Sequence, residues 1–172
     1  MRRTIALAAA VALVAAVPRV SHAQAKPDDP TIVAIFDAAN TWDIASGQLA
    51  EKKGSTKEVR EFGAMLARDH AQVRQLGRDL AKKLNVTPTP PKNFGMANDH
   101  DAAMKSLESA KGAAFDKAFL QHEVAYHQAV LDAVTTTLLP ATQNADLKKL
   151  EETVAPAFAA HRDAAKNMLA KM

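Results

Sequence analysis

Apolar residues recur every three or four positions through four long stretches of this chain, and this spacing constrains the fold more than any other feature. In the second stretch, Val59, Phe62, Leu66 and Val73 fall on one side of a helix. Alanine, leucine, lysine and glutamate, which favour helices, dominate the composition, and only 6 of the 172 residues are glycine. The sequence therefore predicts an all-α fold.

Capping residues give the expected bounds of the first two helices. We expect the first helix from Pro30 to Lys53, with Asp29 as its N-cap and Gly54 ending it. Ser55 and Glu58 match a capping box and predict that the second helix starts at once and continues to about residue 84. A connection this short makes the two helices antiparallel neighbours.

Prolines mark the rest of the chain. Three of them fall between Asn85 and Gly95 and predict a connection, followed by a short helix over about Asp99–Ala110. We expect two more long helices, over about Ala113–Leu139 and Asn144–Lys171, with a kink at Pro156 in the last. The expected architecture is a ferritin-like antiparallel four-helix bundle with one longer crossover that contains a short helix.

The first 25 residues have the pattern of a secretory signal peptide. Arg2 and Arg3 precede an apolar run from Ile5 to Val17, and small residues around Ala23 and Ala25 follow. The run is shorter than the ~20 residues that span a bilayer. We therefore expect a signal peptide over 1–25, a bundle domain over 26–172, export to the periplasm or cell envelope, and no integral membrane span after signal removal.

Charge and composition exclude several function classes. The chain has 22 basic and 19 acidic residues, and losing Arg2, Arg3 and Arg19 with the signal leaves the two signs equal, so no nucleic-acid partner is predicted. Without cysteines there are no disulfides, thiolate metal sites or thiol nucleophiles. No hydrolase-type serine, histidine and acid arrangement or phosphate-binding glycine loop occurs, which disfavours an enzyme. The pattern identifies no substrate or protein partner.

Several ionisable residues fall on the apolar helix faces. At 100° per residue, Glu123, His127 and His161 point into the core, and Asp43 lies at the edge of its stripe. These inward positions also include Asp116, and Asp69 near the midline of the second helix with His70 on its flank. Counted from the turns, Glu123 and His161 lie at about equal heights and Asp43 and His70 differ by about one helical turn, so the geometry allows a single cluster at mid-bundle. His100 is expected at the surface, and His122 away from the core.

Two interpretations of this cluster stay open. A buried unpaired carboxylate is unfavourable by several kcal/mol, so these groups must be paired or bind a cation. The first interpretation is a mononuclear site for one divalent transition metal, with ligands drawn from His70, His127 and His161 plus Glu123 or Asp43. The second is a non-enzymatic structural or partner-binding envelope protein in which the same residues form a stabilising hydrogen-bond network.

A di-iron centre is disfavoured by the spacing. Such centres use a Glu-x-x-His pair on each of two helices. The residues three positions before His70, His127 and His161 are Ala67, Val124 and Phe158, so no such pair is present.

The sequence also resembles a known family. The residues that carry the resemblance are Phe62, Met65, Asp69, His70, Phe115, Asp116, Phe119, His127, Pro156 and His161. They are similar to the motifs of the bacterial domain-of-unknown-function 4142 family, which implies an exported protein with a ferritin-like helical bundle and no settled activity. The first helix departs from that family, because Asp43 and Ala45 stand where it tends to show two glutamates separated by one residue.

Overall fold

The structure, a computed structural model, describes residues 26–92 and 94–172, and the predicted signal peptide lies outside this part of the chain. The described residues form five α-helices and one π-helical turn, without a strand. The elements are α1 (Asp29–Lys53), α2 (Lys57–Lys83), α3 (Gly95–Ser109), α4 (Gly112–Ala133), η1 (Val134–Leu138) and α5 (Ala145–Leu169). The predicted all-α class is confirmed.

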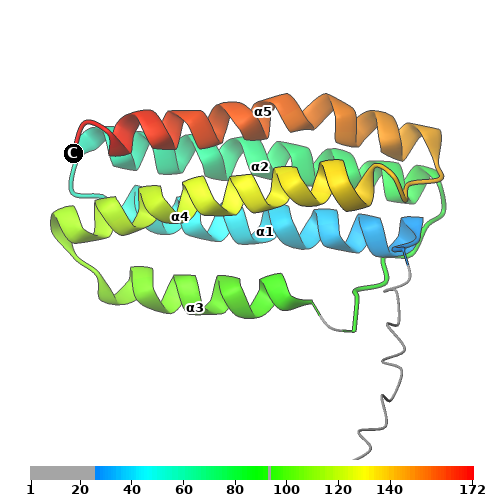
Figure 1. Ribbon diagram of the computed structural model, residues 1–172, viewed down its shortest axis with the longest axis horizontal. Coiled ribbons are helices and arrows are strands. Elements are labelled where there is room, and N and C mark those ends of the chain that lie inside the picture. The colour runs from blue at the N-terminus through cyan, green and yellow to red at the C-terminus, as the bar shows by residue number, and fades with distance from the viewer. Residues whose placement is uncertain (1–25, 93) are drawn as a thin grey trace, which may run out of the picture.

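Four of the helices lie lengthwise side by side, and the fifth runs along one side of them (Figure 1). The hairpins α1–α2 and α4–α5 make the most extensive packing contacts, and α3 packs against α4 and α1. No helix among the described residues is both long enough and apolar enough to cross a membrane.

The α1–α2 hairpin is tight because two glycines face each other across it. A Cβ added to Gly47 would lie 2.6 Å from the carbonyl oxygen of Gly63, and one added to Gly63 would lie 2.6 Å from that of Gly47. These distances are below any normal contact, so only glycine lets the two backbones approach this closely.

Both predicted N-caps of this hairpin are wrong by one residue. Asp28, not Asp29, caps α1 by accepting the Thr31 N–H at 3.0 Å. Thr56, not Ser55, caps α2. Ser55 donates its hydroxyl and its backbone N–H to the Asp116 carboxylate of α4, at 2.6 and 2.8 Å, because this long-range partner competes with the local cap.

The crossover helix α3 begins at Gly95, four residues before the predicted Asp99. It packs through Trp42 of α1, whose ring lies 5.0 Å from that of Phe94 and stacks on His100 at 5.4 Å. The prediction of a surface His100 is therefore wrong, because its side of α3 is covered by α1 and α4 and the residue is only 8% exposed.

The predicted third long helix ends in a wider π turn. The Leu139 N–H donates to the Val134 carbonyl five residues back, at 3.0 Å. Thr135 and Thr136 donate their hydroxyls to carbonyls four residues earlier, and such bonds compete with the regular helical pattern. The last helix, α5, is capped by Asn144 as predicted and continues through Pro156.

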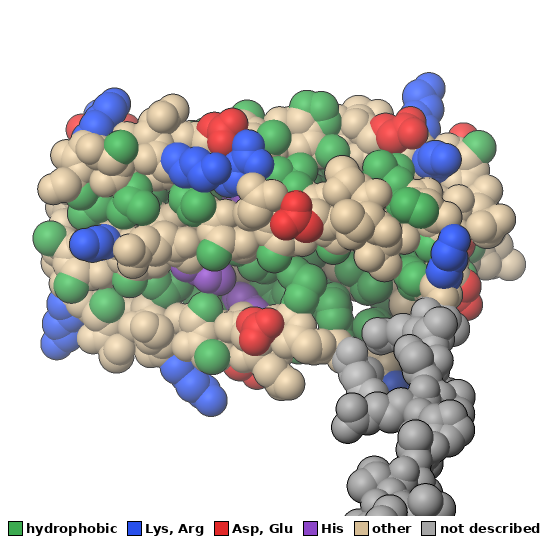
Figure 2. All heavy atoms as spheres, in the orientation of Figure 1, with side chains coloured by type: hydrophobic (Ala, Val, Ile, Leu, Met, Phe, Trp, Pro, Cys, Tyr) green, Lys and Arg blue, Asp and Glu red, His purple; other side chains and the backbone are tan. Residues whose placement is uncertain are grey.

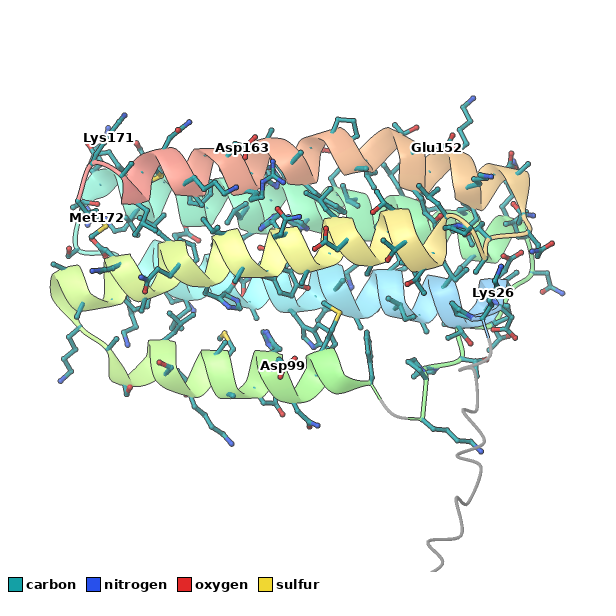
Figure 3. All side chains as sticks on the ribbon, viewed as in Figure 1. Lys26, Asp99, Glu152, Asp163, Lys171 and Met172 are labelled. Atoms are coloured by element: carbon teal, nitrogen blue, oxygen red, sulfur yellow. The ribbon has the colours of Figure 1, made fainter. Side chains whose placement is uncertain are left out.

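The apolar core is divided along the length of the bundle. One cluster, which includes Phe62, Leu66, Phe115 and Phe119, lies toward the α1–α2 turn, and a second, which includes Ile32, Val134 and Leu147, lies toward the other end. Charged residues such as Glu152, Asp163 and Lys171 lie on the outer surface (Figure 3). The buried polar residues between the apolar clusters are thus shielded from water at both ends.

Candidate metal centre

The five residues predicted to form a metal site meet at mid-bundle. Asp43 comes from α1, His70 from α2, Glu123 and His127 from α4, and His161 from α5. All are buried, and His161, the most accessible, is 7% exposed. They form two overlapping groups whose ligand-type atoms lie within 4.8 Å of one another, with His127 common to both. The structure thus brings ionisable side chains from four helices into one cluster, as the helix geometry predicted.

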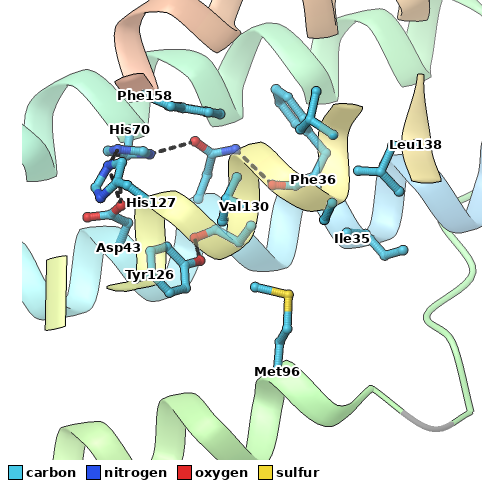
Figure 4. A pocket seen from close by; sticks show the side chains of 14 residues that line it. Ile35, Phe36, Asp43, His70, Met96, Tyr126, His127, Val130, Leu138 and Phe158 are labelled. Carbon is cyan, nitrogen blue, oxygen red and sulfur yellow. Dashed lines mark hydrogen bonds and ion pairs between the residues drawn. The ribbon is translucent and has the colours of Figure 1, made fainter. Parts of the chain in front are cut away.

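The nitrogen and oxygen atoms at the centre are spaced like the ligands of one ion. His70 Nε2 lies 3.3 Å from His127 Nε2, 3.3 Å from His161 Nδ1 and 3.1 Å from Asp43 Oδ2 (Figure 4 shows the first and the third partner). His127 Nε2 lies 3.2 Å from the same Asp43 oxygen. Around a tetrahedral ion with bonds of about 2.0 Å, neighbouring ligand atoms are about 3.3 Å apart. The four separations among these atoms agree with that value, whereas Asp43 and His161 fall in different groups of ligand-type atoms.

The outward nitrogens of His70 and His127 fix where their protons lie. His70 Nδ1 is 2.9 Å from Asn40 Oδ1, and the Asn40 amide nitrogen donates to the Phe36 carbonyl at 2.8 Å, so the oxygen must accept from His70 (Figure 4). His127 Nδ1 is 3.0 Å from the Glu123 carbonyl oxygen, which can only accept. Each ring therefore donates a hydrogen bond from Nδ1 and turns Nε2 inward.

His161 is held the other way round. Its Nε2 lies 3.4 Å from an Asp69 carboxylate oxygen, so Nδ1 points toward His70. Burial and then the charge of His127 lower the pKa of His161, and burial lowers that of His70 to about 2, with the charges of His127 and His161 adding to the effect. Both rings are neutral near pH 7. The inward nitrogens of these two rings, His70 Nε2 and His161 Nδ1, thus carry lone pairs and lie 3.3 Å apart without a proton between them.

Few hydrogen-bond donors surround the two buried carboxylates, Asp43 and Glu123, to stabilise their charged forms. Burial raises the pKa of Asp43 well above its usual value, with the nearby Glu123 charge as the next cause. Burial raises the pKa of Glu123 to about 8, although a hydrogen bond from the Ser46 hydroxyl at 2.9 Å opposes this. Among the described residues, neither Asp43 oxygen nor Glu123 Oε2 has a hydrogen-bond partner. A proton on Asp43 would satisfy one imidazole nitrogen, whereas one cation would satisfy all three.

The geometry separates the roles of the two carboxylates. Asp43 lies on the inner side of both His70 and His127. Glu123 approaches the outer nitrogen of His127, at 3.4 Å, and its other oxygen is held by Ser46. Asp43 is thus the carboxylate placed to be a ligand, and Glu123 lies where it supports His127.

Two of the predicted inward positions are corrected. Asp69, expected near the midline of α2, has a side chain 35% exposed and pairs with Arg68, whereas His70 is the fully buried member. Adjacent residues differ by 100° around a helix, so a small rotation of α2 exchanges them. Asp116 is buried as expected, but it binds the α1–α2 turn and takes no part in the cluster.

The sequence prediction missed three residues that support the site. Asn40 orients His70, Ser46 binds Glu123, and the Tyr126 hydroxyl donates to the Ala39 carbonyl at 2.7 Å. Asn40 and Ser46 lie three positions either side of Asp43, on the same face of α1. That spacing was the sequence feature that placed both residues near Asp43.

A small cavity adjoins the cluster. It has a volume of about 30 Å³ and is bounded by Asp43, His70 and His127 at one end and by apolar side chains such as Phe36 and Leu138 elsewhere (Figure 4). This volume accommodates about one or two water molecules but no organic substrate.

Comparison with solved structures shows the same helical fold elsewhere. The structure of a DUF305 fragment from Deinococcus radiodurans matches with a TM-score of 0.73 at 11% identity, over 83% of this chain and 95% of that one. A protein described as CopM in the Cu(II)-bound form matches with a TM-score of 0.66 at 15% identity, over 84% of this chain and 98% of that one. No curated protein matches the chain by sequence. The match to a family, in contrast, extends over residues 15–168, and the chain therefore belongs to the family described as domain of unknown function DUF4142.

Proposed function

We propose that this protein binds one divalent transition-metal ion of the zinc or copper class in the core of an exported, ferritin-like four-helix bundle. The ligands are His70 Nε2, His127 Nε2, His161 Nδ1 and Asp43 Oδ2. One observation carries the proposal: His127 Nε2, His161 Nδ1 and the buried Asp43 Oδ2 all lie 3.1 to 3.3 Å from His70 Nε2, and the outer nitrogen of each of the three imidazoles lies next to an acceptor oxygen.

The donor set supports this class of ion. Imidazole suits zinc, copper, iron and nickel, and a carboxylate adds the negative charge that a divalent ion prefers. Asn40, the Glu123 carbonyl and Asp69 bind the outer nitrogens, and such partners orient ligating histidines in metal proteins. The fold shared with CopM, whose described form holds Cu(II), favours copper among the ions to be tested.

The site is suited to holding a metal and not to transforming a substrate. Four protein ligands leave no open coordination position, as in structural and storage sites. The adjoining cavity of about 30 Å³ admits no organic molecule. We therefore propose a binding role, and the signal-peptide pattern of residues 1–25 supports a location in the periplasm or cell envelope.

A stabilising hydrogen-bond network is the second candidate function. The raised pKa values of Asp43 and Glu123 favour it, because protonated carboxyls supply donors that a metal-free cluster needs. In that case the protein is a structural or partner-binding envelope protein, and no ion contributes to its stability.

Metal analysis of protein purified without chelators separates the two. The metal proposal predicts about one equivalent of zinc or copper per chain, a melting temperature that rises when the ion is added, and loss of both in His161→Ala. Surface carboxylate Asp37, also on α1, provides the control Asp37→Asn, which keeps both. Metal-free protein whose melting temperature does not respond to zinc, copper, iron or manganese would leave the network as the explanation.

The envelope location has its own test. N-terminal sequencing of the protein from a periplasmic extract should give a mature chain that starts after Ala23 or Ala25. A chain that starts at Met1 and stays in the cytoplasm would contradict export and would leave the metal proposal untouched.

A further inference from the structure

A second group of ligand-type side chains lies outside the buried cluster, in a groove between α3 and α4. The groove has a volume of about 220 Å³, and Met96 and His100 of α3 and His122 of α4 line it, with Asp99 at its exposed rim. Figure 2 shows histidine side chains at the bottom of the hollow between these two helices. Two imidazoles and a thioether thus share one groove that opens to solvent.

His100 is the observation that points to a ligand. It is 8% exposed, and its Nδ1 is buried without a hydrogen-bond partner among the described residues. Its ring stacks on Trp42 with the ring planes 19° apart, which restricts its rotation. Buried polar nitrogens nearly always have a partner, so an orientated imidazole left without one needs an explanation.

Two more ligand-type side chains line the same groove. Met96 and His100 are four residues apart on α3 and therefore lie on the same face, one turn apart. Met96 points from α3 toward α4 (Figure 4). The His122 ring lies on the α4 wall of the groove, next to Tyr126, with ring centroids 5.6 Å apart.

We propose that Met96, His100 and His122 form a second metal site, specific for a soft monovalent ion such as Cu(I). A thioether selects soft ions, and none of the three side chains carries a negative charge, which suits a monovalent ion better than a divalent one. The buried cluster has a carboxylate and no sulfur, which suits a divalent ion.

The second site stands independently of the first. The two donor sets share no residue, although Met96 and Tyr126 line both the groove and the small inner cavity. The groove therefore lies beside the inner site and on its solvent side. Variants in one set leave the other set intact, and the two proposals fail separately.

Silver(I), a redox-inert analogue of Cu(I), provides the test. In the protein with 13C-labelled methionine methyl groups, one equivalent of silver should shift the Met96 signal while that of Met104, two turns further along α3, stays in place. Met96→Leu and His122→Gln should each weaken silver binding at least tenfold, measured by titration against a competing chelator. Met104→Leu is the matched control and should bind as the wild type does.

The outcomes decide between the sites. His161→Ala should keep the Met96 shift, because it alters only the buried cluster. A Met96 signal unmoved by silver, or wild-type affinity in both groove variants, would overturn the second site. The labelling experiment on the wild-type chain decides the question even where a variant fails to fold.

Discussion

Replacing Asp43 by asparagine should stabilise the metal-free protein and weaken metal binding at the same time. The two side chains have the same shape, so the change removes one charge and adds one N–H donor. Asp43 is 1% exposed, and neither oxygen accepts a hydrogen bond from the described residues. No simple loss of packing gives both effects together.

The gain in the metal-free protein follows from the geometry. An asparagine amide at the Asp43 Oδ2 position would lie 3.1 Å from His70 Nε2, which carries a lone pair, and 3.2 Å from His127 Nε2. It would donate one hydrogen bond, worth about 1 kcal/mol, and remove a carboxylate whose ionisation burial opposes. We expect the free energy of unfolding at pH 8 to rise by about 1 to 3 kcal/mol, or the melting temperature by about 3 to 10 °C.

The loss in metal binding can be calculated by linkage. At a free metal concentration 100 times the wild-type Kd, a bound ion stabilises the fold by about 2.7 kcal/mol. Removing the charged ligand should raise Kd about 100-fold, and at the same concentration the stabilisation falls to about 0.4 kcal/mol. Calorimetric melting with and without zinc or copper(II) measures both quantities on the same samples.

The matched control is Asp37→Asn on the same helix. Asp37 pairs with Arg74 and Arg78 at a half-exposed position, so this variant should lose at most about 1 kcal/mol and keep the full metal response. The reasoning is refuted if Asp43→Asn binds the ion as tightly as the wild type, or if the metal-free variant loses several kcal/mol.

Three more predictions follow from the same contacts. The metal-free protein should be most stable near pH 5 to 6, where two opposing effects offset each other. The Glu123 carboxyl, with its pKa of about 8, ionises more readily in the unfolded chain, so it lowers stability as pH rises from about 4.5 to 8, whereas His70 is protonated only in the unfolded chain and lowers stability as pH drops below 6.5. Chemical denaturation across this range should measure slopes of up to about 1.4 kcal/mol per pH unit for each proton. Asn40→Ala should weaken metal binding about 10- to 100-fold, since His70 loses the acceptor that orients it; titration with a competing chelator measures this, and unchanged affinity would contradict the orienting role. Gly63→Ala should destabilise by several kcal/mol in thermal unfolding because its methyl group would overlap the α1 backbone, whereas Gly95→Ala, with open space around it, should not.

The sequence predicted the convergence of the cluster because helix geometry is regular. Rotation of 100° and a rise of 1.5 Å per residue fix direction and height once the turns are located, and Gly54 and Pro140 located them. Glu123 and His161 therefore appeared at one level, and His127 within one turn of them, without knowledge of any contact.

The predictions were wrong where contacts between distant parts of the chain determine the structure. Ser55 does not cap α2 because its hydroxyl binds Asp116, which is 61 residues away. His100 is buried because α3 packs on Trp42. Asp69 and His70 differ only by a rotation of α2 that the facing helices determine. The spacing of Asn40 from Asp43 places it on the right face of α1, but its hydrogen bond depends on the position of the His70 ring, which the spacing does not give.

Anomalous X-ray diffraction from crystals of the zinc- or copper-loaded protein tests the central claim most directly. We predict a strong anomalous peak in the bundle core, about 2.0 to 2.2 Å from His70 Nε2, His127 Nε2, His161 Nδ1 and Asp43 Oδ2. A core without such a peak, in which these side chains contact only one another, would contradict the account and identify the cluster as a hydrogen-bond network.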